Sequence, residues 1–241
     1  MYNTTQLNPD TTFERHVYHR DQFAHFLRWT HVLKTVKIGM NILDFGCGSG
    51  NLAEVLYRNR YKAEKYVGLD IRNKTINSNI EKYNSVPWVS FQQQDLCGDL
   101  SLDSNWDIIA SFEVIEHIGK HNARKFLSNI VQCMNKDTIL LLSTPVFDEK
   151  VGAASNHIID GEIGEFGFDE LKHILEEFFI IENVWGTFAS QRDYKIDMHD
   201  TLKELYTRAH EYFDSNILSN LMAPLISPEK ARNCLWRCKL K

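Results

Sequence analysis

A chain of 241 residues suffices for one large domain, and 43% hydrophobic and 24% charged residues are typical of a globular protein with a sizeable core. The net charge of −5 argues against a large basic surface for nucleic acid, and no apolar run reaches membrane-spanning length. The first residues lack a signal-peptide pattern, and the five cysteines include no CxxC pair. We therefore expect a cytoplasmic protein without a membrane partner or a disulfide framework.

The predicted elements alternate between helices and strands. Residues 13–34 carry apolar side chains at helical spacing, which indicates one or two leading helices. Short apolar runs predict five strands, at 41–45, 66–69, 88–93, 106–112 and 138–143. Helical patterns between them cover 51–61, 73–83 and 121–134. This alternation predicts a parallel sheet covered by helices on both faces.

The last third of the chain departs from this alternation. A helix is expected at 168–178 and a strand at 179–185, followed by a polar helical pattern and a closing strand in which Cys234 and Cys238 face the same way as Trp236. We expect one domain over residues 1–241, divided into an N-terminal helical cover (1–38), a core (40–185), a helical insertion (186–229) and a final strand (231–240). The cover and the insertion would lie over a substrate site.

A glycine-rich run, DFGCGSGNL at 44–52, follows a strand and opens a helix, which is the context of a nucleotide-binding loop. Its glycines let the backbone turn sharply and approach a ligand closely. Asp70 ends the next strand 20 residues after Gly50, where a carboxylate can accept both hydroxyls of a ribose. The GxGxG spacing lacks the third, helix-packing glycine of the dinucleotide fingerprint. Taken alone, the loop also fits a glycine-rich turn of another α/β protein.

DFGCGSG resembles the first motif of class I S-adenosylmethionine (SAM)-dependent methyltransferases, (D/E)xGxGxG. GLDI at 68–71 resembles their second motif, QDL at 94–96 their acidic position after the third strand, and FEVIEHI at 112–118 their segment after the fourth. The four motifs occur in order within residues 40–185. The resemblance implies an α/β Rossmann-like fold with seven mainly parallel strands, an antiparallel last strand and helices on both faces.

The resemblance also implies SAM as the cofactor and assigns its binding residues. These are Asp44, Gly46, Cys47, Gly48, Gly50, Asp70, Ile71, Asp95, Leu96 and Phe112. Asp44 would orient the loop or the cofactor amine, and Asp70 would hold the ribose. Asp95 and Leu96 would frame the adenine, and Phe112 would lie near the sulfonium. The cofactor carries the reactive methyl group, so the protein mainly positions it.

The segment Glu113-x-x-Glu116-His117 concentrates three chemically active side chains. On a helix these positions share nearly one face, where two carboxylates and an imidazole can bind Mg or Mn. Two other interpretations stay open: a pocket wall with His117 as a general base, or a structural histidine. The catalytic candidates are therefore His117, Glu113 and Glu116, and the metal candidates are the same three with His157.

Two methyltransferase families share this segment. One comprises the 2′-O-methyltransferases of small RNA, which this chain resembles in Glu-x-x-Glu-His, in Ser143-Thr144-Pro145 and in a later histidine, for which His157 is the candidate. The other comprises the O-methyltransferases of ubiquinone synthesis, which carry Glu-Val-x-Glu-His. The sequence around His157, ASNHI, departs from the His-rich, Arg-flanked stretch of the RNA family. This departure weakens the fourth metal ligand and the RNA substrate together.

We therefore expect a SAM-dependent methyltransferase of class EC 2.1.1 that methylates an O or N atom of a small-molecule acceptor. One alternative is an RNA or DNA methyltransferase of the 2′-O type, assisted by a metal. The other is a SAM-binding module without turnover. No Asn/Asp-Pro-Pro-Tyr/Phe or Pro-Cys follows the fourth strand, which argues against methylation of base amines or of cytosine C5. The sequence leaves the oligomeric state open.

Overall fold

A computed structural model describes residues 20–61, 63–100, 102, 105–149, 152–153, 157–189, 200–213, 218, 221–225 and 227–241. Its helices are α2 (Arg20–Thr35), α3 (Asn51–Arg58), α4 (Asn73–Lys82), α5 (Ala123–Cys133), α6 (Phe168–Phe178) and α8 (Asp200–Ala209). Its main strands are β1 (Asn41–Phe45), β2 (Lys65–Asp70), β3 (Val89–Gln93), β4 (Ile108–Phe112), β5 (Ile139–Phe147), β9 (Phe179–Ala189) and β10 (Ala231–Leu240). Three two-residue strands lie between β5 and α6: β6 (Ile158–Ile159), β7 (Glu162–Ile163) and β8 (Phe166–Gly167).

The main strands form one sheet in the order β3-β2-β1-β4-β5-β10-β9. The first five strands pair in parallel, and β10 is antiparallel to both β5 and β9. The predicted α/β class, with a mainly parallel sheet and an antiparallel last strand, is therefore confirmed. The short β8 pairs with the end of β5, which gives this sheet one strand more than predicted.

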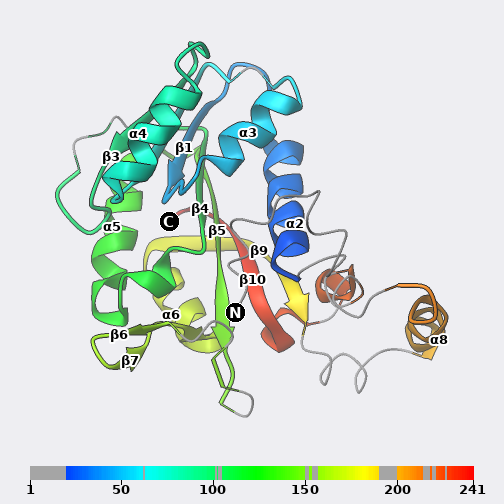
Figure 1. Ribbon diagram of the computed structural model, residues 1–241. Coiled ribbons are helices and arrows are strands. Elements are labelled where there is room, and N and C mark those ends of the chain that lie inside the picture. The colour runs from blue at the N-terminus through cyan, green and yellow to red at the C-terminus, as the bar shows by residue number, and fades with distance from the viewer. Residues whose placement is uncertain are drawn as a thin grey trace.

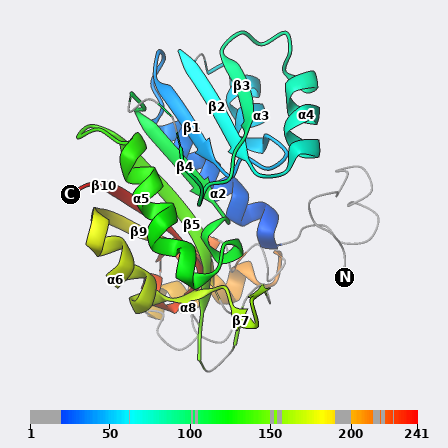
Figure 2. The ribbon, with the colours of Figure 1, turned by 90° about the vertical axis from the view of Figure 1, so that its left-hand side faces the viewer.

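Helices cover both faces of the sheet (Figures 1 and 2). On one face α2, α3 and α4 bury an apolar cluster that includes Val32, Leu52 and Leu56. On the other face α5 and α6 bury a second cluster that includes Phe126 and Leu175. Burial of this apolar surface on both sides explains why β1, β4 and β5 are nearly continuous apolar runs.

Strand β5 is longer than the predicted run at 138–143 because it continues, still buried, through the Ser-Thr-Pro motif to Phe147. Ser143 pairs with Phe112 at the carboxyl end of β4, and the extension places Thr144 beyond it at the same edge of the sheet. The last strand has the predicted bounds, and Cys234, Trp236 and Cys238 are all buried in the cluster under α5 and α6. Their common face agrees with the period of two in a strand.

The N-terminal cover and the late insertion are described in part. Helix α2 lies beside α3 and β9, whereas α8 stands apart from the sheet (Figure 1). A small separate core includes Tyr206 of α8 with Leu218, Met222 and Ala223. Residues 1–19 of the predicted cover (1–38) and residues 190–199 of the predicted insertion (186–229) lie outside the described residues, and the single-domain division stays a prediction. No helix within the described ranges is long and apolar enough to cross a membrane.

Candidate functional site

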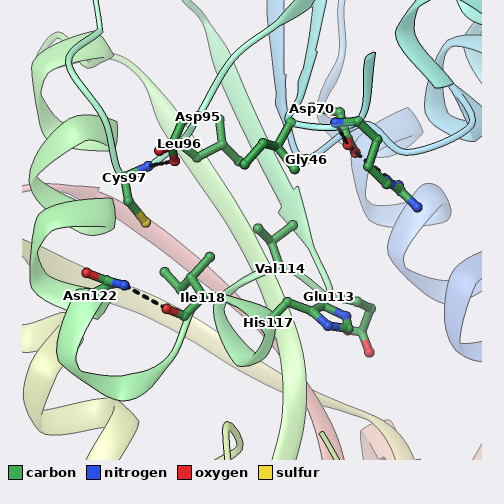
Figure 3. Close-up of a pocket in the computed structure, with 12 residues that line it drawn as sticks. Gly46, Asp70, Asp95, Leu96, Cys97, Glu113, Val114, His117, Ile118 and Asn122 are labelled. Atoms are coloured by element: carbon green, nitrogen blue, oxygen red, sulfur yellow. Dashed lines mark hydrogen bonds and ion pairs between the residues drawn. The ribbon is translucent and has the colours of Figure 1, made fainter. Parts of the chain in front are cut away.

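A cavity of about 510 Å³ lies where β1, β2, β3 and β4 end, at the carboxyl edge of the parallel strands. Ligands of open α/β sheets bind at this edge. The side chains that surround it come from the four loops that follow these strands (Figure 3). Its lining residues are Gly46, Asp70, Ile71, Arg72, Asp95, Leu96, Cys97, Glu113, Val114, His117, Ile118 and Asn122.

The glycine-rich loop after β1 has a backbone that other residues adopt only with strain. Gly46, Gly48 and Gly50 have φ of +94°, +50° and +74°. A Cβ on Gly46 would lie 2.3 Å from the Val114 Cγ2 atom, so the loop after β4 packs directly against this glycine. The Asn79 side chain of α4 donates a hydrogen bond of 2.8 Å to the Gly48 carbonyl and fixes the loop from behind.

The Asp70 carboxylate ends β2 and accepts four hydrogen bonds. Its Oδ2 atom accepts from the Gly48 N–H at 3.0 Å, and its Oδ1 atom accepts from the Arg72 N–H at 2.9 Å. The Arg72 guanidinium adds a bidentate pair of 2.9 and 3.0 Å. Burial alone would raise the pKa of Asp70, but the hydrogen bonds and the charge of Arg72 outweigh it and lower this pKa. Asp70 is therefore an ionised acceptor at the cavity wall.

Asp44 lies beneath the glycine-rich loop and does not line the cavity. Its carboxyl group is 3% exposed and accepts a hydrogen bond of 2.6 Å from the Tyr66 hydroxyl. Burial raises the pKa of Asp44 to about 7, although the Tyr66 hydrogen bond opposes this shift. The resemblance predicts that Asp44 orients the loop or the cofactor amine. The structure brings it to the base of the loop.

Other predicted cofactor residues also support the cavity from outside its lining. Burial raises the pKa of the Cys47 thiol well above its usual range, in line with a packing role. Gly50 is the N-cap residue of α3, and Phe112 packs at the margin of the cluster beneath α2 and α3. The cofactor contacts assigned to these residues and to Gly48 stay predictions.

The loop after β3 forms the opposite wall of the cavity. The Asp95 Oδ1 atom accepts a hydrogen bond of 2.9 Å from the Cys97 N–H, which turns the chain sharply (Figure 3). The buried Asn129 side chain of α5 donates hydrogen bonds of 2.8 Å to the carbonyls of Leu96 and Gly98. These contacts hold Asp95 and Leu96 at the cavity wall, and their predicted role of framing an adenine stays a prediction.

The segment after β4 is not the helix that the sequence predicts for Glu113, Glu116 and His117. Glu113 has a left-handed backbone with φ of +58°, residues Ile115–His117 form one 3-10 turn, and α5 begins only at Ala123. Gly46 packs against Val114 so closely that the chain turns here instead of starting a helix. The three side chains therefore do not share one helical face.

Glu113 is held by side chains from three distant segments. Its Oε1 atom accepts a hydrogen bond of 2.8 Å from the Ser143 hydroxyl and lies 3.4 Å from Arg28 Nη2. Its Oε2 atom accepts a hydrogen bond of 2.8 Å from Asn233 Nδ2. The Asn233 Oδ1 atom in turn accepts one of 2.5 Å from the Thr187 hydroxyl. Arg28, Ser143, Asn233 and Thr187 are all buried, so the carboxylate is fixed in one orientation at the cavity wall.

Glu116 and His117 differ sharply in exposure. Glu116 is 1% exposed, accepts a hydrogen bond of 3.0 Å from the Thr144 hydroxyl, and has a pKa that burial and the charge of Glu113 raise well above its usual value. The His117 side chain is 47% exposed and lines the cavity. Burial of part of the ring and the neighbouring His157 lower the pKa of His117, so its imidazole is neutral at pH 7. The His117 and His157 rings lie 4.0 Å apart between centroids.

The four metal candidates do not form a ligand set. The Glu113 carboxylate faces Arg28, Ser143 and Asn233, and the Glu116 carboxyl group is buried against Thr144. Among the residues that the structure describes, no group of three or more His, Cys, Asp or Glu side chains could hold a metal ion. The arrangement brings His117 and His157 together but does not fit the predicted Mg or Mn site.

Sequence reasoning missed several residues that shape the site. Arg72 follows Asp70 by two positions, and this Asp-x-Arg spacing at a strand end could have indicated a pair. Asn79 lies nearly two helical turns beyond the start of α4 and carries no comparable signal. Arg28 and Asn233 belong to the first and last described elements of the chain and meet Glu113 only in the folded protein.

Comparison with known proteins adds independent information. The family described as "Methyltransferase domain" matches residues 18–178. The ubiquinone biosynthesis O-methyltransferase of Rickettsia akari (strain Hartford) is 30% identical over 105 residues, which cover 44% of this chain and 40% of that protein. The sphingolipid C9-methyltransferase of Komagataella phaffii is 30% identical over 131 residues, 46% of this chain and 25% of that protein. The chain thus spans less than half the length of these curated relatives.

Solved structures show the same fold at low identity. The methyltransferase domain of bacterial CtHen1-C superimposes with a TM-score of 0.61 at 15% identity and covers 92% of this chain and 99% of that domain. The phosphoethanolamine N-methyltransferase 2 of Haemonchus contortus, in complex with SAM, gives a TM-score of 0.56 at 14% identity and covers 100% of this chain and 61% of that protein. At these identities the likeness shows the fold alone.

Proposed function

The chain belongs to the methyltransferase-domain family, and from this membership we propose that it transfers a methyl group from SAM to an O or N atom of a small-molecule acceptor. One observation carries the proposal. The glycine-rich loop, Asp70 and the Asp95 loop meet the exposed His117 imidazole and the fixed Glu113 carboxylate in a single cavity.

The residues present fit SAM as a cofactor. A cavity of about 510 Å³ is within the range of small-molecule sites. The Gly46 backbone lines the cavity, the ionised Asp70 would hold the ribose, and Ile71 is 61% exposed beside it. Asp95 and Leu96 would frame the adenine. When bound, SAM supplies an activated methyl group.

His117 is the residue that we assign as general base. Its imidazole lines the cavity, and the lowered pKa leaves it neutral and able to accept the proton that an acceptor hydroxyl or amine releases. Glu113 would orient the acceptor through the carboxylate that Ser143 and Asn233 hold in place. The buried Glu116 touches Thr144 and acts as structural support under this assignment.

Two alternatives lead to different experiments. An RNA or DNA methyltransferase that uses a metal would require the Glu113, Glu116, His117 and His157 ligand set, which the described residues do not form. A SAM-binding module without turnover would bind the cofactor and leave His117 without a role. Two relatives are named as an O-methyltransferase of ubiquinone biosynthesis and as a sphingolipid C9-methyltransferase, so quinone-like phenols and sphingolipids are the first acceptors to test. A cytoplasmic location stays a prediction.

The testing experiment combines binding and transfer. Calorimetric titration with SAM and S-adenosylhomocysteine (SAH), with and without Mg and EDTA, should give one metal-independent site. Transfer of a labelled methyl group to a panel of phenols, amines, lipids and RNA should then identify the acceptor.

The variant His117→Ala should lower transfer about 100-fold or more while SAH binding stays unchanged. His121→Ala is the matched control, because His121 is exposed and does not line the cavity. Absence of SAM and SAH binding would overturn the proposal, and unchanged transfer in His117→Ala would overturn the base assignment.

A further inference from the structure

The Asp70 carboxylate has no acceptor position left for a ligand. A carboxylate has about four lone-pair positions, and four N–H donors from Gly48 and Arg72 occupy them at 2.9 to 3.0 Å. Two ribose hydroxyls can therefore bind Asp70 only if two of these donors leave.

The two backbone donors cannot leave, because Gly48 belongs to the loop that Asn79 fixes, and the Arg72 N–H lies at the N-cap of α4. The two donors of the Arg72 guanidinium can leave. The Arg72 side chain is 62% exposed and lines the cavity. Its Nη2 atom lies 3.4 Å from the point where a Cβ on Gly48 would stand, so the guanidinium covers the slot between the glycine-rich loop and Asp70.

We propose that Arg72 is an affinity-setting residue of the cofactor site: its guanidinium occupies the ribose position on Asp70 and must be displaced when the nucleoside binds. This inference rests on the proposed function. On binding, the two ribose hydroxyls replace the Nε and Nη2 donors on Asp70, and the guanidinium turns to solvent. Asp70 stays ionised throughout, and it keeps the hydrogen bonds from the Gly48 and Arg72 backbone N–H groups.

The chain contains a matched control for this pair. On the far side of the sheet, the Arg124 guanidinium of α5 binds the Glu177 carboxylate of α6 with the same bidentate geometry, at 2.7 and 2.9 Å. The side chain of Arg124 is 58% exposed, close to the value for Arg72, and it does not line the cavity. Arg124→Gln therefore removes a bidentate ion pair of a similarly exposed arginine without touching the ribose position, although Glu177 is 34% exposed and Asp70 only 7%.

The experiment is calorimetric titration of SAH into wild type, Arg72→Gln, Arg72→Lys and Arg124→Gln, with thermal melting to verify folding. Arg72→Gln should bind SAH about fivefold more tightly than wild type, which is the size expected for loss of an ion pair with one exposed partner, the guanidinium. Arg72→Lys keeps the charge but not the bidentate geometry and should fall between the two. Arg124→Gln should match wild type.

Salt gives a second measurement on the same proteins. Because the Arg72 guanidinium is exposed and ionic strength screens its attraction to Asp70, the difference between wild type and Arg72→Gln should shrink as KCl rises from about 50 to about 500 mM. Equal or weaker SAH binding by Arg72→Gln at low salt would overturn the inference and make Arg72 a permanent clamp for Asp70. Failure of every protein to bind SAH would instead overturn the proposed function.

Discussion

The two sides of the cavity are built in different ways. On the side proposed for the cofactor, called the cofactor side below, the loops after β1 and β2 are held through their backbone groups by neighbours 22 to 31 residues apart, as in the contacts Gly48–Asp70 and Asn79–Gly48. On the side proposed for the acceptor, called the acceptor side below, the Glu113 carboxylate is held by side chains, one of them, Asn233, 120 residues away. The cofactor side is thus a local backbone structure, whereas the acceptor side is assembled by the whole fold.

This difference separates what each side requires of the sequence. A backbone structure needs glycines at positions of positive φ and little else, so it leaves a recognisable motif. A buried side-chain network needs every donor and acceptor to be matched, because an unmatched buried polar group is costly. Three predictions challenge or sharpen this contrast, in order of decreasing effect.

The largest effect should follow from adding one methyl group to the cofactor side. In Gly46→Ala the new Cβ meets Val114 at 2.3 Å on a backbone with φ of +94°, so the loop must move. We expect SAH affinity to fall about 100-fold or more, as measured by calorimetry. Gly39→Ala is the control, because Gly39 has φ of +85° but no atom within 4 Å of the new Cβ. An equal loss of SAH affinity in Gly46→Ala and Gly39→Ala would contradict the view that the close contact between Gly46 and Val114 shapes the loop.

Arg28→Met tests whether the two sides are independent. Loss of the buried guanidinium leaves the Glu113 carboxylate without its cation, and we expect the free energy of unfolding to fall by about 3 kcal/mol in urea titrations. SAH affinity should stay within about twofold of wild type. Arg237→Met, which removes a partly exposed partner of Glu182, should cost less stability. A tenfold loss of SAH affinity in Arg28→Met would show that the sides are coupled.

A smaller, pH-dependent effect should come from Asp44. Its pKa is about 7 in the folded protein against 3.8 as the ordinary value, so the folded state retains a proton that the unfolded state loses. Stability therefore falls as pH rises from about 4 to 7. Asp44→Asn should remove on the order of 2 kcal/mol of this decrease between pH 5 and 7.5 in urea titrations. In contrast, Glu177→Gln removes an exposed carboxyl group with a lowered pKa and should leave the slope nearly unchanged. An unchanged slope in Asp44→Asn would contradict the raised pKa.

The contrast between local and long-range contacts explains which features could be predicted from the sequence. The bounds of α6 and β10 agree with the sequence pattern because clear apolar periodicity and flanking residues define them. The glycine-rich loop and Asp70 were located because their chemistry is local. The turn at Glu113 was missed because Val114 packs against Gly46, a contact across nearly 70 positions that no helical period reveals. The partners Arg28 and Asn233 were missed because they come together only when the sheet is complete.

The position of β10 also has a consequence for biosynthesis. Strand β9 is attached to the sheet through β10, which lies between it and β5, although β10 is the later of the two in the chain. While residues 231–240 are still inside the ribosome, β9 lacks its native partner strand, and Trp236 is missing from the core under α6. The parallel strands can form early in the nascent chain. The part of the cavity wall in which Asn233 holds Glu113 can form only after β10 has emerged.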